Sequence, residues 1–189
     1  MTSPVKKGWR EAMNELWYTY SGDIDKKTTA DTLLWLSNQL HSQGQSITKL
    51  RFFISSGGGD MDSAISLYDY LKAFPSTVET IGFGRVESAA VLIFLAGSKR
   101  SAVKDCRFLL HEGLYTVGQP TNTLQMHQET LNLFKTLLDR MTEIVAKETG
   151  HEKAKIAKIL RKGRTLTAVE AKDLGLVQKI IDEIPQREQ

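Results

Sequence analysis

The chain has 189 residues with 25 basic and 22 acidic side chains, which leaves a net charge of +3. This length suits one domain, and basic runs no longer than SKR and RKGR argue against nucleic acid as a partner. The single cysteine, Cys106, excludes an internal disulfide, and the N-terminus lacks the apolar core of a signal peptide, so we expect a cytoplasmic protein. The longest apolar run, residues 89–97, is far below the roughly 20 residues that cross a membrane. We expect a buried helix there and no membrane partner.

Segments rich in β-branched and aromatic residues alternate with helical patterns along the chain. Strands are expected at residues 16–22, 47–55, 77–84, 106–113 and 176–181. This alternation predicts an α/β domain with a largely parallel sheet. Residues 1–189 are expected to form a single domain, in which residues 1–15 are an N-terminal segment.

Two shorter helices can be predicted from their apolar spacing and their ends. In residues 60–74 the apolar face consists of Met61, Ala64, Ile65, Tyr68 and Leu71. Near the C-terminus, Thr167 and Glu170 have the spacing of a capping box, and Gly175 stands where a glycine would end the helix.

The longest helix is expected at about residues 122–147. Its apolar residues recur at steps of three and four: Leu131, Phe134, Leu138, Met141 and Val145. Leu137 and Ile144 widen this stripe, which indicates contact on more than one side. Such a helix either packs across a subunit interface or lies in the core of one chain, and the pattern leaves both open.

Three consecutive glycines, Gly57, Gly58 and Gly59, follow an apolar strand and precede a helix. Glycines can turn several backbone N–H groups into one concavity, which holds a phosphate or a developing oxyanion. The pattern matches neither the phosphate loop G-x-x-x-x-G-K-[ST] nor G-x-G-x-x-G, so it gives little support to nucleotide binding. The alternative is a flexible turn between strand and helix.

Ser88 lies between a strand-like segment and the apolar run. A hydroxyl at a helix N-terminus would lie beside free N–H groups that can stabilise negative charge, as a nucleophile requires. Serine is also a favoured N-cap. Ser88 by itself is therefore either a nucleophile or an ordinary cap.

His111 ends an apolar strand, whereas His41, His127 and His151 lie in helices or at their ends. A lone histidine on a strand is more often a satisfied core or surface group than a base. However, the glycine loop, Ser88 and His111 all follow strands, and reacting groups collect at the carboxyl ends of parallel strands. A nucleophile, a base and a pair of backbone donors are the minimum set for acyl transfer.

With these motifs the chain resembles the proteolytic subunit of the Clp protease family, serine peptidases on the Clp/crotonase fold, from about residue 17 to 182. FFISSGGGDMDSAISLYDYLK resembles the family's I-N-S-P-G-G segment and the helix after it. GFGRVESAAVLIFLAG resembles G-x-A-A-S-M-G-A-x-L-L-x-A-G, FLLHEGLYTVGQPTNTLQMH resembles the segment carrying the base, and GRTLTAVEAKDLGLVQKI resembles R-F-L-S-A-x-E-A-x-x-Y-G-L-V-D.

The resemblance implies a fold of stacked parallel strands with surrounding helices, and a site without metal or cofactor. It places the nucleophile at Ser88 and the base at His111. The oxyanion donors would be the N–H groups of Gly59, with Gly58 as neighbour, and of Ala89. It further implies peptide or unfolded polypeptide as substrate, and stacked homo-oligomeric rings with the helix at 122–147 at the contact between rings.

Several positions depart from the family pattern. Gly163 stands where the family has the aspartate of its triad, and Asp139, Glu112 and Asp173 are candidates to replace that aspartate. Gly57 replaces the proline of the glycine loop, and Ala89 replaces the methionine after the serine, which leaves the N–H at that position available. The segment MTSPVKKGWREAMNEL has no clear counterpart of the loop that engages the family's ATPase, so we do not expect a Clp-type ATPase partner.

Three functions are compatible with these residues. The first is a serine endopeptidase whose third triad member is absent or relocated. The second is a ring-forming homologue of low or no activity with a structural or regulatory role. The third is a crotonase-type acyl-CoA enzyme, although such enzymes generally lack a serine and a histidine at these two positions.

Overall fold

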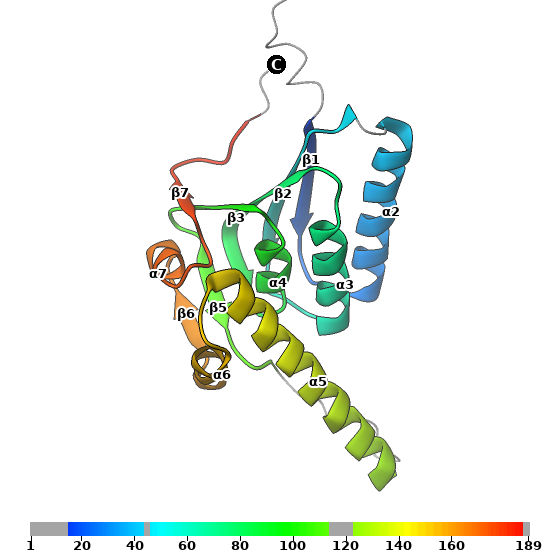
Figure 1. Ribbon diagram of the computed structural model, residues 1–189, viewed down its shortest axis with the longest axis vertical. Helices are drawn as coiled ribbons and strands as arrows, with labels where there is room; N and C mark the ends of the chain where they lie inside the picture. The colour runs from blue at the N-terminus through cyan, green and yellow to red at the C-terminus, as the bar shows by residue number, and fades with distance from the viewer. Residues whose placement is uncertain (1–14, 44–45, 114–122, 187–189) are drawn as a thin grey trace, which may run out of the picture.

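The computed structural model describes residues 15–43, 46–113 and 123–186, and within them the sheet has seven strands (Figure 1). Five strands lie side by side in the order β1 (Glu15–Ser21), β2 (Lys49–Ser56), β3 (Thr77–Glu87), β4 (Lys99–Val103) and β7 (Lys179–Ile181). Each pairs with its neighbour in parallel. The expected α/β class and the largely parallel sheet are therefore confirmed.

The long strand β3 has a different neighbour at each end. Residues 79–82 pair with β4, whereas residues 85–87 pair in parallel with β5 (Arg107–Leu110). Gly84, at φ 61°, lies between the two parts. The short strand β6 (Arg164–Leu166) then pairs with β5 in the antiparallel direction. This last pairing positions the candidate site, and neither β4 nor β6 was expected from the sequence.

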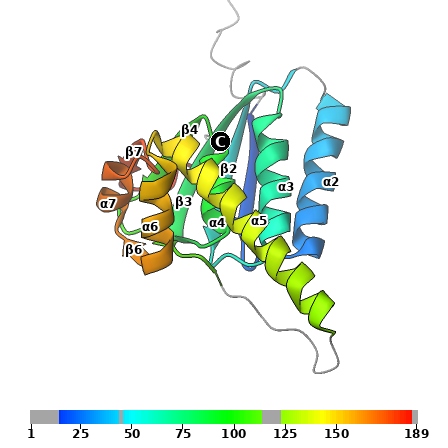
Figure 2. The same ribbon diagram turned by 60° about the horizontal axis from the view of Figure 1, so that its bottom comes forward.

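Helices contribute buried residues to the core beside the sheet. The helices α2 (Lys26–Gln43) and α3 (Met61–Lys72) lie side by side, and every residue of α4 (Ala90–Leu95) is buried (Figures 1 and 2). Phe94 of α4 meets Phe108 of β5 edge to face, with ring centroids 5.3 Å apart. The buried helix expected within residues 89–97 is thus confirmed, although it is shorter.

The helix α3 has nearly the expected apolar face. Ala64, Tyr68 and Leu71 are buried, whereas Met61 and Ile65 are only partly buried. Leu67, which the sequence analysis did not include, is also buried.

The long helix α5 (Leu124–Thr149) packs on the core only through its C-terminal part. Met141, Ile144 and Val145 are buried there. The N-terminal half projects away from the rest of the fold (Figures 1 and 2), and Leu124 and Leu133 are 86% and 51% exposed. Within the predicted apolar stripe, Met141 and Val145 are buried, whereas Leu131, Phe134 and Leu138 are only partly buried, so the stripe is only half covered within one chain.

Two further helices follow α5. α6 (Lys153–Lys162) was not expected, whereas α7 (Ala168–Asp173) lies where the sequence places a helix. The capping box of Thr167 and Glu170 is present, and Gly175 follows the helix at φ 81°. The short β7 is the end of the segment expected as the last strand.

A buried ion pair ties α3, α5 and β4 together. Arg100 is 7% exposed, and its Nη1 lies 3.6 Å from Oε2 of Glu148. Tyr68 donates a 2.7 Å hydrogen bond to the same carboxylate, and Nζ of Lys72 lies 3.0 Å from it. Arg100 also donates to the backbone carbonyl of Leu176, so one guanidinium joins segments far apart in sequence.

Candidate active site

Ser88 occupies a sharp turn between β3 and α4. It has φ 55° and is the one non-glycine residue at positive φ in the described part of the chain. The N-cap position of α4 belongs to Ala89, and no side chain caps this helix. The structure therefore differs from the capping interpretation of Ser88, whose hydroxyl bonds to no described residue. A serine in a strained turn between strand and helix is instead typical of an exposed nucleophile.

The glycine loop packs directly against this turn. A Cβ at Gly58 would lie 2.7 Å from Cβ of Ser88 and 3.1 Å from the nitrogen of Ala89. Gly58 and Gly59 also have φ values of 96° and 144°, which side chains rarely allow. Only glycine therefore lets this loop approach Ser88 so closely.

The backbone bonds around the loop distinguish the predicted oxyanion donors. The N–H of Gly58 donates to Oγ of Ser56 at 3.1 Å, so it is already engaged. Ile24 and the glycine loop form a short parallel β-bridge, in which Ile24 donates to the carbonyl of Gly58 and Asp60 donates to the carbonyl of Ile24. The N–H of Gly59 takes no part in these two hydrogen bonds. Neither Gly59 nor Ala89 has an acceptor for its N–H within the described residues. These two amides are the ones available to an oxyanion.

His111 follows β5, next to the Ser88 turn. The N–H of Ser88 donates to the carbonyl of Leu109 at 2.8 Å, and His111 is two residues further along. The β5–β6 register pairs Leu110 with Arg164, so the next opposing pair is His111 and Gly163. A Cβ at Gly163 would lie 3.9 Å from Cβ of His111. The fold thus brings Ser88, the glycine loop, His111 and Gly163 to one place.

The candidate replacements for the missing aspartate have other partners. Asp139 pairs with Lys153 at 2.7 Å, and Glu112 lies 3.7 Å from the guanidinium of Arg161. Among the described residues, neither carboxylate forms a hydrogen bond or ion pair with His111.

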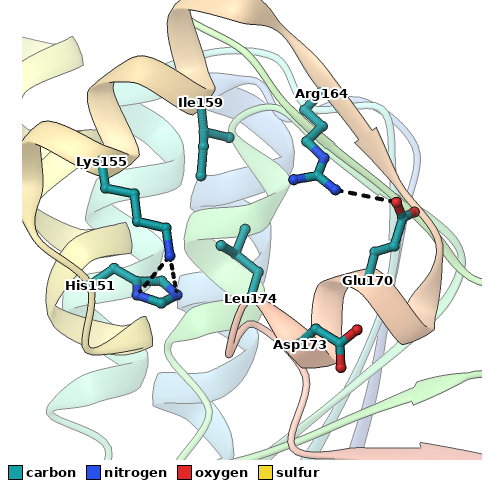
Figure 3. Close-up of a pocket in the computed structure, with 7 residues that line it drawn as sticks. All are labelled: His151, Lys155, Ile159, Arg164, Glu170, Asp173 and Leu174. Atoms are coloured by element: carbon teal, nitrogen blue, oxygen red, sulfur yellow. Dashed lines mark hydrogen bonds and ion pairs between the residues drawn. The ribbon is translucent and has the colours of Figure 1, made fainter.

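Asp173, the third candidate, lines a cavity of about 230 Å³ between α6 and α7 (Figure 3). Arg164 and Glu170 line the same cavity and pair at 3.3 Å. Within the described ranges, Asp173 likewise makes no hydrogen bond or ion pair with His111.

Within the described ranges, no group of three or more His, Cys, Asp or Glu side chains could hold a metal ion. Burial raises the pKa of the Cys106 thiol to about 12, so this thiol is a poor nucleophile. No described helix is long and apolar enough to span a membrane.

Sequence reasoning missed two cations near the site. The Arg85 guanidinium lies 3.3 Å from where a Cβ of Gly57 would be, beside the glycine loop. Arg161, at the end of α6, approaches Glu112 next to His111. No motif marks either residue, because only the pairing of β5 with β3 and β6 brings them there.

Comparison with known proteins identifies the family. The Clp protease family model matches residues 9–184 of the chain. The chain belongs to the Clp protease family. It is thus a member of a family of serine peptidases, which are hydrolases, and this membership favours peptidase chemistry over the acyl-CoA alternative.

Individual relatives agree with this assignment. The ATP-dependent Clp protease proteolytic subunit 2 of Treponema denticola is 30% identical over 163 residues, which is 85% of this chain and 78% of the relative. Its namesake from Pseudomonas aeruginosa is 32% identical over 164 residues, with the same coverage. The structure of a single-residue mutant of ClpP1 from Listeria monocytogenes matches 95% of this chain and 96% of its own, with a TM-score of 0.74 at 24% identity. The expected Clp-type fold is therefore confirmed.

Proposed function

We propose that this Clp-family chain is a serine endopeptidase in which Ser88 is the nucleophile and His111 the base. The observation that carries the proposal is the turn at Ser88, which is held at φ 55°, bonded to the strand that leads to His111 and packed against Gly58. Such a turn costs of the order of 1–3 kcal/mol and persists only where the surroundings hold it. The free N–H groups of Gly59 and Ala89 supply the oxyanion donors.

The reaction then follows from these groups. Oγ of Ser88 attacks the peptide carbonyl carbon and forms a C–O bond, while its proton passes to His111. The N–H groups of Gly59 and Ala89 stabilise the negative oxygen of the tetrahedral intermediate. The C–N bond breaks, His111 gives its proton to the leaving amine, and water hydrolyses the acyl ester to restore Ser88.

The second candidate function is a ring-forming subunit with little or no activity. Gly163 favours it, because the position that faces His111 offers no side chain. Loss of the aspartate's role costs on the order of 10⁴ in turnover in triads of this chemistry. A chain with that loss could serve mainly as a structural or regulatory subunit.

Labelling with a fluorophosphonate probe tests the nucleophile. We expect the wild-type chain to be labelled and Ser88→Ala to be unlabelled. The matched control is Ser66→Ala, because Ser66 is an exposed serine of α3 that donates only to the carbonyl of Asp62. If wild type and Ser88→Ala label equally, or if neither labels, Ser88 is not the nucleophile. Hydrolysis of fluorogenic peptides by the same protein separates the peptidase from the inactive subunit.

The proposal extends to assembly and location. The half-covered stripe of α5 supports homo-oligomeric rings in which this helix lies at the contact between rings, as the family resemblance implies. The substrate would be peptide or unfolded polypeptide, and the chain would act in the cytoplasm. The prediction of no Clp-type ATPase partner rests on residues 1–16, of which 1–14 lie outside the described residues, so it stays a prediction. The curated relatives are themselves named ATP-dependent.

Mass measurement in solution tests the assembly. Leu133→Glu puts a charge on the exposed apolar part of α5 and is expected to reduce the assembled fraction, because Leu133 is 51% exposed in the single chain. Gln128→Glu adds the same charge at an exposed polar position of the same helix and serves as the control. A wild-type monomer, or equal loss in both variants, would contradict the proposed role of α5.

A further inference from the structure

The place beside His111 is open to a group from outside the chain. Gly163 faces His111 across the β5–β6 pair and is exposed. A side chain there would start 3.9 Å from Cβ of His111, yet glycine has none. Among the described residues, no carboxylate of the chain bonds to His111. An anion that reached this place would lie beside His111 at an exposed position of the chain.

The surroundings favour a carboxylate over other groups. All charged residues of α6 are basic, and Arg161 and Lys162 lie in its last turn, directly before Gly163. The side chain of Arg161 is 76% exposed, and its pair with Glu112 is long, at 3.7 Å. An exposed pair of this length is worth little and is easily exchanged for a better one. Arg161 can therefore pair with an arriving carboxylate. Its positive charge also offsets the repulsion between that carboxylate and the negative C-terminal end of the α6 helix dipole.

We propose that an acidic side chain of the substrate peptide takes this place, so that the site is completed by the substrate and selects peptides that carry a Glu or Asp near the scissile bond. This inference rests on the proposed peptidase function. The substrate carboxylate accepts a hydrogen bond from the His111 nitrogen that faces away from Ser88 and stabilises the imidazolium formed when Ser88 attacks. Its neighbour Arg161 holds the carboxylate. The substrate thereby supplies the part that Gly163 lacks.

The test is a set of fluorogenic peptides in which one Glu is moved through the positions on both sides of the scissile bond. Each peptide has a partner with Gln at the same position, which keeps size and polarity and removes the charge. For the wild type we expect at least one position where Glu raises kcat/KM about tenfold or more over Gln, a small part of the roughly 10⁴ that a triad aspartate is worth. Equal rates for Glu and Gln at every position overturn the proposal.

Variants show where any preference arises. In Gly163→Asp the ratio of Glu to Gln rates should fall towards one, because the chain then carries its own carboxylate beside His111. Arg161→Gln should also lower the ratio, whereas Lys158→Gln, which removes another exposed cation of α6, should not. A ratio that stays unchanged in both Gly163→Asp and Arg161→Gln places the selectivity elsewhere and overturns the proposal.

Two further measurements keep the outcomes distinct. Formate added to the wild type with a Gln peptide should raise the rate, whereas chloride at equal ionic strength should not. If Gly163→Asp fails to fold, the proposal is still tested by the effect of formate and by the ratio of Glu to Gln rates in Arg161→Gln. If Ser88 is labelled by the fluorophosphonate but neither Glu nor formate has an effect, only this inference fails. If Ser88 is not labelled at all, the proposed function fails first.

Discussion

Replacing Gly163 by Asp tests directly how much activity the missing carboxylate costs. A Cβ at this position lies 3.9 Å from Cβ of His111. Both the carboxyl group and the imidazole begin one bond beyond these atoms, so a hydrogen bond of about 2.7–3.2 Å between them is within reach. The backbone opposes the change, since Gly163 has φ 65° and ψ 112°, a conformation that favours glycine. The variant therefore combines an expected catalytic gain with a definite strain.

The strain is measured as a change in the free energy of unfolding, and the catalytic gain as a change in kcat/KM. Strain of the order of 1–3 kcal/mol should lower the free energy of unfolding of Gly163→Asp. A restored triad would raise kcat/KM by up to about 10⁴, which corresponds to about 5 kcal/mol in the barrier. Gly163→Asn is the control, because it carries the same strain and nearly the same shape without the charge. We expect equal destabilisation of both variants in urea and a gain in peptide turnover only for Asp.

A result in which Asp and Asn change turnover alike would refute the reasoning. It would mean that the imidazole of His111 needs no carboxylate here, or that position 163 cannot present one. High turnover by the wild type with peptides that carry no acid would point the same way. It would also remove the case for an inactive ring subunit.

Four further predictions concern the site and the core. Ser88→Gly should raise the free energy of unfolding by about 1 kcal/mol, because it relieves φ 55°, whereas Ser88→Ala keeps the strain; urea unfolding compares them. Arg100→Met should cost about 3–5 kcal/mol in the same assay, because the carboxylate of Glu148 stays buried with a weaker set of partners. Burial by itself would raise the pKa of Glu148, but the hydrogen bond from Tyr68 and nearby cations outweigh it and lower the pKa. The ionised Glu148 carboxylate should therefore stabilise the fold fully above pH 4.5, and this stabilisation should decline as the pH falls further. A plot of the urea midpoint against pH should show this decline for the wild type and not for Glu148→Gln. Cys106 should resist maleimide in the folded protein and react once urea unfolds it, because its thiol is 1% exposed with a raised pKa.

Much of the sheet could be predicted because its strands are long and apolar. The segments that became β1, β2 and β3 contain runs of β-branched and aromatic residues, which are a strong local signal. The short β6, with the sequence RTL, has no such run and forms only because β5 lies opposite it. β4 has the sequence KRSAV and is likewise made a strand by its neighbours β3 and β7. Local sequence contains no information on these pairings.

The candidate site shows the same division. The order of the glycine loop, Ser88 and His111 along the chain was visible in the sequence, because each follows a recognisable strand. The conformation of Ser88 was not visible, since serine before a helix is usually a cap and nothing in the local sequence marks a positive φ at a serine. The place of Gly163 beside His111 followed only from the family resemblance, because β6, which brings Gly163 there, has no pattern of its own.

Gly163 has a second role that bears on every attempt to restore the site. Its N–H donates to the carbonyl of Leu160, and its positive φ ends α6 and turns the chain into β6. The same residue therefore fixes the strand that faces His111 and leaves the space beside it. A side chain at this position alters the backbone turn into β6 and fills the space beside His111 at the same time. A carboxylate supplied by a peptide or by formate fills that space and leaves the backbone unchanged. If the site works with an outside carboxylate, added formate should thus give a gain without any loss of stability, and Gly163→Asp should give a gain only together with that loss.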